Sequence, residues 1–301
     1  MTLSIALAWC DPYPPVVDDE VPLRDALAAL GATPSTPAWD AAIRWSDFDA
    51  VLLRCTWDYH ERADQFLAWC LATSRVTRLV NGPEVVRWNL DKRYLAELER
   101  HGLPIADTIW FEPDATRDAI DQGIGEALRR GWTRCMLKPA IAANAWGTLR
   151  LDLSDPAAHA LARAHLAKPE WGARPFLMQT YLSAVETEGE LSVIVIDGVP
   201  THGVRKVPAR GDYRVQEDWG ARDVPWEPEP AALELARRAF EVAREVTGED
   251  LLYGRVDLLR NADGDLVLNE LELVEPALFF RHGPQAATRL AEALVARVRG
   301  A

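Results

Sequence analysis

One segment, residues 253–272, constrains the fold more than any other part of the sequence, because it has the pattern of a β-hairpin. The tetrapeptide Asn261-Ala-Asp-Gly264 is typical of a tight turn, and a strand-like run lies on each side of it. This turn sets an expected register in which the opposed pairs are Arg260 and Asp265, Asp257 and Leu268, and Arg255 and Glu270.

Side chains on a strand alternate between the two faces of the sheet, so the hairpin divides into two unlike faces. The apolar face carries Val256, Leu258, Val267, Leu271 and Leu273, with Asn269 as a polar exception. The other face carries Arg255, Asp257, Glu270 and Glu272. Carboxylates opposed across strands repel each other, and Arg255 neutralises only one of them. Divalent cations, which take oxygen ligands, would satisfy the others. The alternative is an ordinary acidic face that points into water.

Composition narrows the classes of function. The chain has 301 residues and a formal charge of −13, which argues against a partner that is a nucleic acid. It is 49% hydrophobic, enough for a sizeable core, and its length suggests about two domains. No apolar run approaches the roughly 18 residues of a membrane span, and no basic segment precedes the first apolar stretch. We therefore expect a cytoplasmic protein without a membrane partner, with its four cysteines reduced.

The order of predicted elements indicates a parallel α/β unit followed by a more antiparallel region. Residues 1–82 alternate strands and helices, with strands over 3–9 and 50–55 and helices over 21–30 and 61–74. Further helices are expected over 91–101, 114–130, 156–167, 229–247 and 284–298. Further strands are expected over 133–139, 148–153, 176–182 and 191–208, besides the hairpin at 252–273.

Lysine is scarce in this chain, and three of its four lysines fall at the ends of predicted elements, where ligands are usually met. Lys138 ends an apolar strand and precedes the loop 140–147. Lys92 is placed in the first turn of a helix that begins at Asp91, where the helix dipole disfavours a cation. Lys206 ends a strand and precedes a polar loop at 209–216.

The order of these motifs resembles the ATP-grasp superfamily over about residues 81–280. Within it, the chain is similar to the glutathione-synthetase-like branch and to the cyclo-ligases that close O-ureido-serine to cycloserine. The motifs are Asn81-Gly-Pro with Lys92, Lys138-Pro, Met178-Gln-Thr-Tyr-Leu182, Gly189-Glu190, Lys206-Val-Pro-x-x-Gly-Asp-x-Arg214, Asp257, and Glu270-x-Glu272.

The resemblance implies an α/β fold of the mixed α+β, ATP-grasp type. An N-terminal parallel α/β substrate domain at 1–82 would precede two ATP-grasp subdomains, a central one at 83–175 and a C-terminal one at 176–301, with antiparallel sheets sandwiching the nucleotide.

The resemblance also implies roles for single residues. Lys92 and Lys138 would hold the ATP phosphates. Gln179, Tyr181 and Leu182 would bind adenine, and Glu190 would bind the ribose hydroxyls. Lys206 and Arg214 would stabilise the phosphoryl group in transfer, with Arg255 as a third catalytic cation and the loop 209–216 as a lid. Asp257, Glu270 and Glu272 would bind two Mg²⁺ ions, with Mn²⁺ as an alternative.

Two positions depart from the family pattern. Glu272 stands where the third metal ligand is usually Asn, which makes the site more acidic. The phosphate loop 140–147 is rich in Ala and has a single Gly, at position 147. Because alanine resists positive φ, we expect this loop to be stiffer than a glycine-rich one.

The substrate is expected beyond the strand that ends near residue 54, since ligands of open α/β sheets bind outside strand C-termini. Arg54 is a candidate for a substrate carboxylate, with Tyr59 beside it. Asp58 has a structural alternative, because Glu61 three residues later would complete a helix capping box. Arg205 and Glu275 are further substrate candidates, whereas His202 is interpreted as a sheet residue rather than a base.

These features predict an ATP-dependent ligase that activates a carboxylate as an acyl phosphate and joins it to a nitrogen nucleophile. The expected partner is a small amino acid or peptide, and O-ureido-serine is a specific candidate for intramolecular closure. A homodimer and a homotetramer are both compatible with the sequence. The alternative from another class is a nucleotide-binding sensor or assembly module without turnover.

Overall fold

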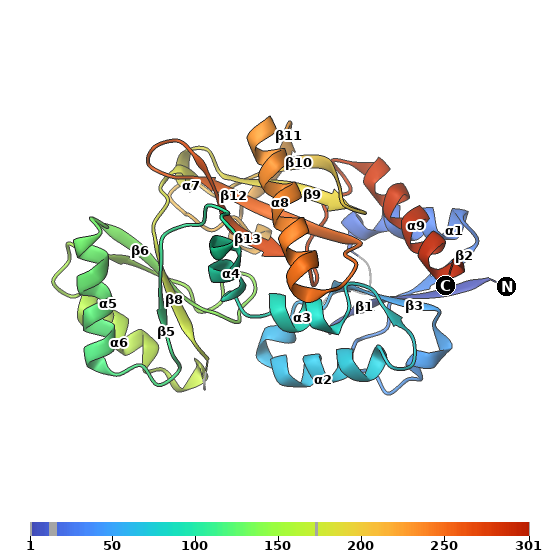
Figure 1. Cartoon of the computed structure of the whole chain (residues 1–301), viewed down its shortest axis with the longest axis horizontal. Coiled ribbons are helices and arrows are strands. Elements are labelled where there is room, and N and C mark those ends of the chain that lie inside the picture. Colours follow the sequence, from blue (N-terminus) through green and yellow to red (C-terminus); the bar gives the residue numbers. More distant parts are fainter. Residues whose placement is uncertain (1, 12–16, 172–173, 301) are drawn as a thin grey trace.

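The computed structural model describes residues 2–11, 17–171 and 174–300. Three sheets follow one another along the chain, each with its own helices (Figure 1). The hydrophobic core is correspondingly divided into separate clusters, of which the largest joins the first and third sheets.

The first sheet is parallel, as the alternation of elements predicted. Its strands are β1 (Leu3–Trp9), β2 (Ala32–Ser35), β3 (Ala50–Cys55) and β4 (Arg78–Leu79), in the order β2-β1-β3-β4. Helices α1 (Val21–Ala29) and α2 (Ala63–Thr73) connect them. β1 and β3 are buried over most of their length, so both read as nearly continuous apolar runs. β2 and β4 are short edge strands that the sequence patterns did not predict.

The second sheet is antiparallel and has the order β5-β8-β6-β7. Its strands are β5 (Thr108–Phe111), β6 (Arg134–Pro139), β7 (Leu149–Asp152) and β8 (Phe176–Thr180). Helices α5 (Arg117–Arg129) and α6 (Ala158–Leu166) contribute to the same core cluster as this sheet. Because β8 pairs with β5 and β6, this subdomain continues past the boundary expected at residue 175.

The third sheet is antiparallel and has the order β11-β10-β9-β12-β13. Its strands are β9 (Glu190–Ile196), β10 (Val199–Val207), β11 (Arg222–Trp226), β12 (Tyr253–Arg260) and β13 (Leu266–Glu272). The block expected as one stretch over 191–208 is in fact two strands. Asp197 and Gly198 both have positive φ at the turn between them. Such an Asp-Gly pair is a strong hairpin signal, which the sequence prediction did not use.

The remaining helices join the three parts. α8 (Pro230–Thr247) packs on the third sheet, and α9 (Pro284–Arg299) packs on α1, close to the N-terminal strand (Figure 1). Three shorter helices are α3 (Pro83–Asn89), α4 (Tyr94–Arg100) and α7 (Ala184–Thr187). The one-turn 3₁₀ helices are η1 (Asp18–Glu20), η2 (Trp45–Asp47), η3 (Tyr59–Glu61), η4 (Pro169–Trp171) and η5 (Glu217–Trp219).

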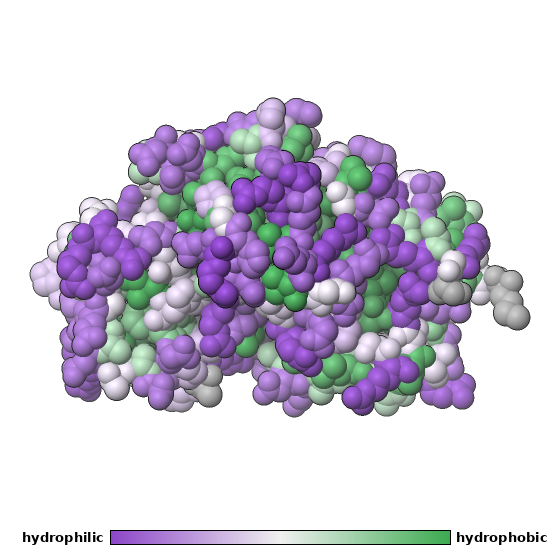
Figure 2. Space-filling model, viewed as in Figure 1, coloured by the Kyte–Doolittle hydropathy of each residue, from purple (hydrophilic) through white to green (hydrophobic). Residues whose placement is uncertain are grey.

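The surface is mostly hydrophilic on the face seen in Figure 2, with hydrophobic side chains showing in separated groups. No helix among the described residues is long and apolar enough to cross a membrane. The four cysteines are buried and unbridged. Cys55 is the last residue of β3, and Cys10 directly follows β1.

Candidate active site

A cavity of about 750 Å³ is lined by residues of all three sheets, together with the loops 142–145 and 213–218. This volume lies within the range of small-molecule and cofactor sites. The cavity brings together almost every residue that the sequence pointed to. Those that line it are Arg54, Tyr59, Lys92, Lys138, Gln179, Tyr181, Leu182, Glu190, Lys206, Arg214, Arg255, Asp257, Glu270, Glu272 and Glu275.

The β12–β13 hairpin carries its charged residues on one face, but its expected register is wrong. Arg255 pairs with Glu272 and Asp257 with Glu270, whereas Leu258 pairs with Leu268. Next to the turn, Arg260 pairs with Leu266 and not with Asp265, so the turn is one residue longer than expected. A β-bulge at Asn269 then inserts a further residue into β13, so the pairs beyond it are two positions from those expected. The bulge also turns Asn269 away from the apolar face, so that its Nδ2 donates to Glu190. This explains the polar exception in the sequence pattern.

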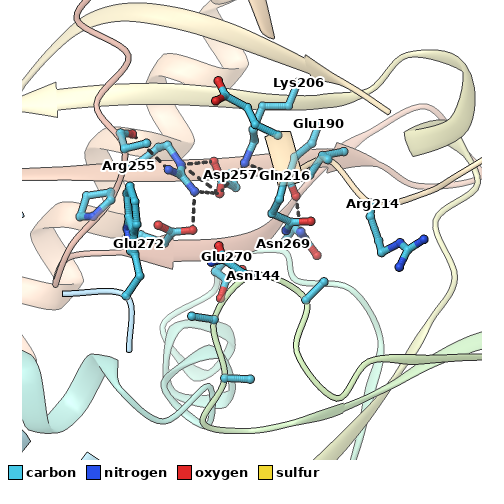
Figure 3. A pocket seen from close by; sticks show the side chains of 18 of the residues that line it. Asn144, Glu190, Lys206, Arg214, Gln216, Arg255, Asp257, Asn269, Glu270 and Glu272 are labelled. Carbon is cyan, nitrogen blue, oxygen red and sulfur yellow. Dashed lines mark hydrogen bonds and ion pairs between the residues drawn. The ribbon is translucent and has the colours of Figure 1, made fainter. Parts of the chain in front are cut away.

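Asp257 is the centre of a network of charged side chains (Figure 3). It accepts hydrogen bonds from Ser192 Oγ at 2.6 Å, Lys206 Nζ at 3.0 Å and Arg255 Nε at 2.9 Å. Arg255 also bonds to Glu272, and Lys206 also bonds to Glu190. The positive group expected among the carboxylates is therefore supplied by two cations of the chain itself.

The pKa values of these acids differ because their partners differ. Burial acts to raise the pKa of Asp257, but Arg255 and Lys206 outweigh it and hold the pKa well below its usual range. Burial also raises the pKa of Glu272, to about 7, since Arg255 only partly opposes burial and the charges of Asp257 and Glu270. The pKa of Glu190 is raised by burial despite the nearby Lys206.

The two N-terminal lysines face the same carboxylates but have different partners. Lys92 Nζ lies 2.6 Å from Glu270 and donates to Ala142 O at 3.0 Å. Its expected helical position is wrong, because it lies in the link between α3 and α4 and not in a first turn. Lys138 has no hydrogen bond or ion pair with any residue that the structure describes, and burial lowers its pKa although Glu270 opposes that shift. Its ammonium is therefore available to an anionic ligand.

The expected metal ligands share one face, but they do not form a ready metal site. Among the described residues, no group of three or more His, Cys, Asp or Glu side chains is placed to hold a metal ion. The side chains of Glu270 and Glu272 are 28% and 27% exposed, so their hard oxygen donors reach the cavity and fit a divalent ion. Asp257 is enclosed by three donors, and it fits an ion only if Arg255 or Lys206 changes partner.

The end of β8 lines the cavity from the second sheet. Gln179 is buried and donates through Nε2 to Thr108 Oγ1 at 3.1 Å. The amide of Tyr181 donates to Arg134 O, so this particular amide is already used within the sheet. Leu182 follows it along the cavity wall.

The loop expected to act as a lid lies at the edge of the cavity. Arg214 bonds to Asp212, stacks 3.5 Å above the centre of the Trp219 ring and points away from the carboxylate cluster (Figure 3). Gln216 also lines the cavity, and its Oε1 is buried without a hydrogen-bond partner. Arg205 was expected to contact substrate, but it is exposed and does not line the cavity. It alternates with Lys206 along β10 and therefore faces the other way.

The alanine-rich loop 140–147 takes the backbone conformation that alanine was expected to resist. Asn144 and Ala145 both have positive φ, as does Gly147. Such conformations in residues other than glycine cost about 1–3 kcal/mol each and cluster at functional sites. Trp219 Nε1 donates to Asn144 O at 3.4 Å, which links this loop to the loop at 213–219.

The N-terminal side of the cavity differs from expectation at two residues. Arg54 is 1% exposed and forms a buried ion pair with Glu20 at 2.6 Å. Its guanidinium therefore bonds mainly to the protein itself, and only Nη1 has no hydrogen-bond partner. Asp58 forms no capping box, because it bonds instead to Trp39 and Arg62. Tyr59 is buried at the cavity wall.

His202 lies on β10 and bonds through Nε2 to two backbone carbonyls, which confirms it as a structural residue.

Comparison with known proteins identifies the family. Residues 5–81 match the N-terminal domain of D-cycloserine synthetase DcsG, and residues 120–263 match the ATP-grasp domain of prokaryotic glutathione synthetase. The chain is 33% identical over 304 residues to the cycloserine biosynthesis protein DcsG of Streptomyces lavendulae, and the match covers 95% of each protein. The chain belongs to the ATP-grasp family.

Solved structures agree with this assignment. The crystal structure of D-cycloserine synthetase DcsG is similar with a TM-score of 0.88 and 31% identity, covering 98% of this chain and 99% of that one. D-alanyl-alanine synthetase A from Vibrio cholerae has a TM-score of 0.70 at 14% identity, covering 99% of this chain and 98% of that one, which shows a shared fold. The protein is thus an ATP-dependent ligase, and the alternative of a sensor without turnover is not favoured.

Proposed function

We propose that this ATP-grasp ligase closes O-ureido-serine to cycloserine. The observation that supports this most is the 33% identity to a cycloserine biosynthesis protein along 95% of the chain. The match includes residues 5–81, which form the N-terminal side of the cavity, where we place the substrate. A shared ATP-grasp domain alone would support only an ATP-dependent ligase, without indicating its substrate.

The reaction needs ATP because an ionised carboxylate is a poor electrophile. A carboxylate oxygen of the substrate attacks the γ-phosphorus, ADP leaves, and an acyl phosphate results. The substituted nitrogen of the ureido group then attacks the carbonyl carbon and loses its proton, and phosphate leaves with the bonding electrons. Atom balance requires subsequent hydrolysis of the carbamoyl group to carbon dioxide and ammonia, which yields cycloserine.

The side chains on the cavity wall suit this chemistry. We assign Lys92 and Lys138 to the ATP phosphates, and Lys206 with Arg255 to the oxygens of the transferred phosphoryl group. The segment 179–182 would bind adenine, and Glu190 the ribose. Glu270 and Glu272 would hold Mg²⁺, or Mn²⁺, which when bound neutralises charge on the phosphate oxygens. The loop 209–216 would exclude water from the acyl phosphate.

Mass spectrometry of products tests this proposal directly. With ATP, Mg²⁺ and a panel of amino acids, we expect O-ureido-serine to give cycloserine, with ADP and phosphate formed together. Matched reactions without ATP should give no product. Turnover of a different amino acid, with O-ureido-serine inert, would refute the proposed substrate and leave the ligase class intact.

A further inference from the structure

Five acidic side chains of the described residues are buried and line the cavity. Four of them bond to a basic side chain of the protein. These pairs are Asp19 with Arg281, Glu20 with Arg54, Glu190 with Lys206, and Asp257 with both Lys206 and Arg255. The fifth acid, Glu275, forms no ion pair with any basic side chain that the structure describes.

An ionised carboxylate is costly to bury without a partner, so a buried acid is either neutral or lies beside a cation. Glu275 is 8% exposed. Burial is the main cause that raises its pKa, to about 8, and the charge of Glu272 adds to the effect. Arg255 and Lys92 oppose this shift, but each of them already bonds to another carboxylate. Among the buried acids of the described residues that line the cavity, Glu275 is therefore the one with no cation of its own.

The backbone around Glu275 is held in place by side chains from other parts of the protein. Every backbone carbonyl from residue 274 to residue 279 accepts a hydrogen bond from a side chain. The donors are Tyr253 to Val274, Trp57 to Glu275, Arg54 to Pro276, Arg255 to Ala277, and His202 to both Leu278 and Phe279. These donors come from β3 and the loop after it, from β10 and from β12.

We propose that Glu275 receives the protonated α-amino group of the amino-acid substrate. This inference rests on the proposed function, because it requires a substrate that carries an ammonium group. An α-amino acid brings one cationic group and one carboxylate into the cavity. The carboxylate is the group to be phosphorylated, and it suits the side lined by Lys206 and Arg255. The ammonium group matches the carboxylate that lacks a partner.

The test compares Glu275→Gln with the parent enzyme on two substrates that differ only in the amino group. These are O-ureido-serine and its desamino counterpart, 3-(ureidooxy)propanoic acid. Loss of a charge-assisted hydrogen bond should raise the KM for O-ureido-serine roughly 10- to 100-fold in the variant. The KM for the desamino compound should be the same in both enzymes. Glu245→Gln makes the same change at an exposed acid of α8 that does not line the cavity; it is the control and should alter neither value.

Three outcomes would overturn the assignment. Equal losses on both substrates would mean that Glu275 only supports the structure, and a lower kcat with unchanged KM would make it a base. If the variant does not fold, the KM values of the parent enzyme for the two compounds are compared instead. Equal values would refute the inference. If O-ureido-serine is inert, the same comparison with whichever amino acid is turned over still tests Glu275. Failure of the proposed function is thus distinguishable from failure of this inference.

Discussion

The ion pair between Arg54 and Glu20 gives a prediction whose size follows from burial. The two side chains are 1% and 3% exposed and meet at 2.6 Å, at the junction of β3 and η1. Arg54 also donates to Pro276 O at 3.1 Å. Replacing Arg54 by Met leaves the Glu20 carboxylate buried without a partner, which typically costs about 3–5 kcal/mol. We therefore expect Arg54→Met to lower the free energy of unfolding by that amount.

Equilibrium urea unfolding, followed by tryptophan fluorescence, measures this change. The double variant Glu20→Leu/Arg54→Met should regain most of the lost stability, since two apolar side chains can replace a buried pair. The exposed pair Arg44 and Asp47 is the control, with side chains 84% and 56% exposed. Its variant Arg44→Met should change stability by less than about 1 kcal/mol.

The same experiment separates an internal role for Arg54 from a role in binding. The sequence suggested that this guanidinium holds a substrate carboxylate, whereas the structure pairs it with Glu20. If Arg54→Met is as stable as the parent and only the KM for the amino acid rises, the argument from burial is wrong. Loss of stability that the double variant restores would establish the internal pair.

Three further outcomes can be measured. Lys138→Met should raise the Kd for ATP, measured by calorimetry, at least tenfold. Its free energy of unfolding in urea should not change, because no ion pair is lost, and a destabilised variant would contradict this. Glu270→Gln should raise the Mg²⁺ concentration needed for half-maximal turnover about tenfold or more, and an unchanged requirement would exclude it as a metal ligand. Burial lowers the pKa of His165 and His202, so the unfolded chain binds protons more readily. Stability should then fall as the pH drops below about 6.5, by at most about 1.4 kcal/mol per pH unit for each histidine, and His202→Gln should reduce the slope of this loss.

Local patterns in the sequence predicted the elements of this fold well where side-chain periodicity was strong. The long helices α8 and α9, the buried strands β1 and β3, and the hairpin at residues 253–272 all follow from such patterns. The edge strands β2 and β4 do not, because such short strands exist only through pairing with a neighbour. Pairing with a distant segment is a tertiary effect that local propensity does not contain.

The hairpin register shows the same limit at the site itself. Alternation placed Arg255, Asp257, Glu270 and Glu272 on one face, and the structure confirms this. The cross-strand pairs were wrong for two reasons: the turn is one residue longer than expected, and Asn269 bulges out to reach Glu190, which lies 79 positions away in the chain. The one polar residue on the expected apolar face was the visible sign of that bulge. The partners of Lys92 and Lys206, and the pair of Arg255 with Glu272, were likewise beyond local prediction, since these ion pairs join different strands or loops.

The ion pairs also suggest how the cavity keeps its charge balanced when ligands enter. Four cations, Lys92, Lys138, Lys206 and Arg255, stand against four carboxylates, Glu190, Asp257, Glu270 and Glu272. ATP carries roughly four negative charges, which two Mg²⁺ ions would offset, so the nucleotide and its metals would enter as a nearly neutral group. The phosphates would then become the partners of the lysines. The metal ions would take the place of the lysines as partners of the carboxylates. Glu275 has no ion pair in this set, and in the assignment proposed above its partner is the ammonium group of the second substrate.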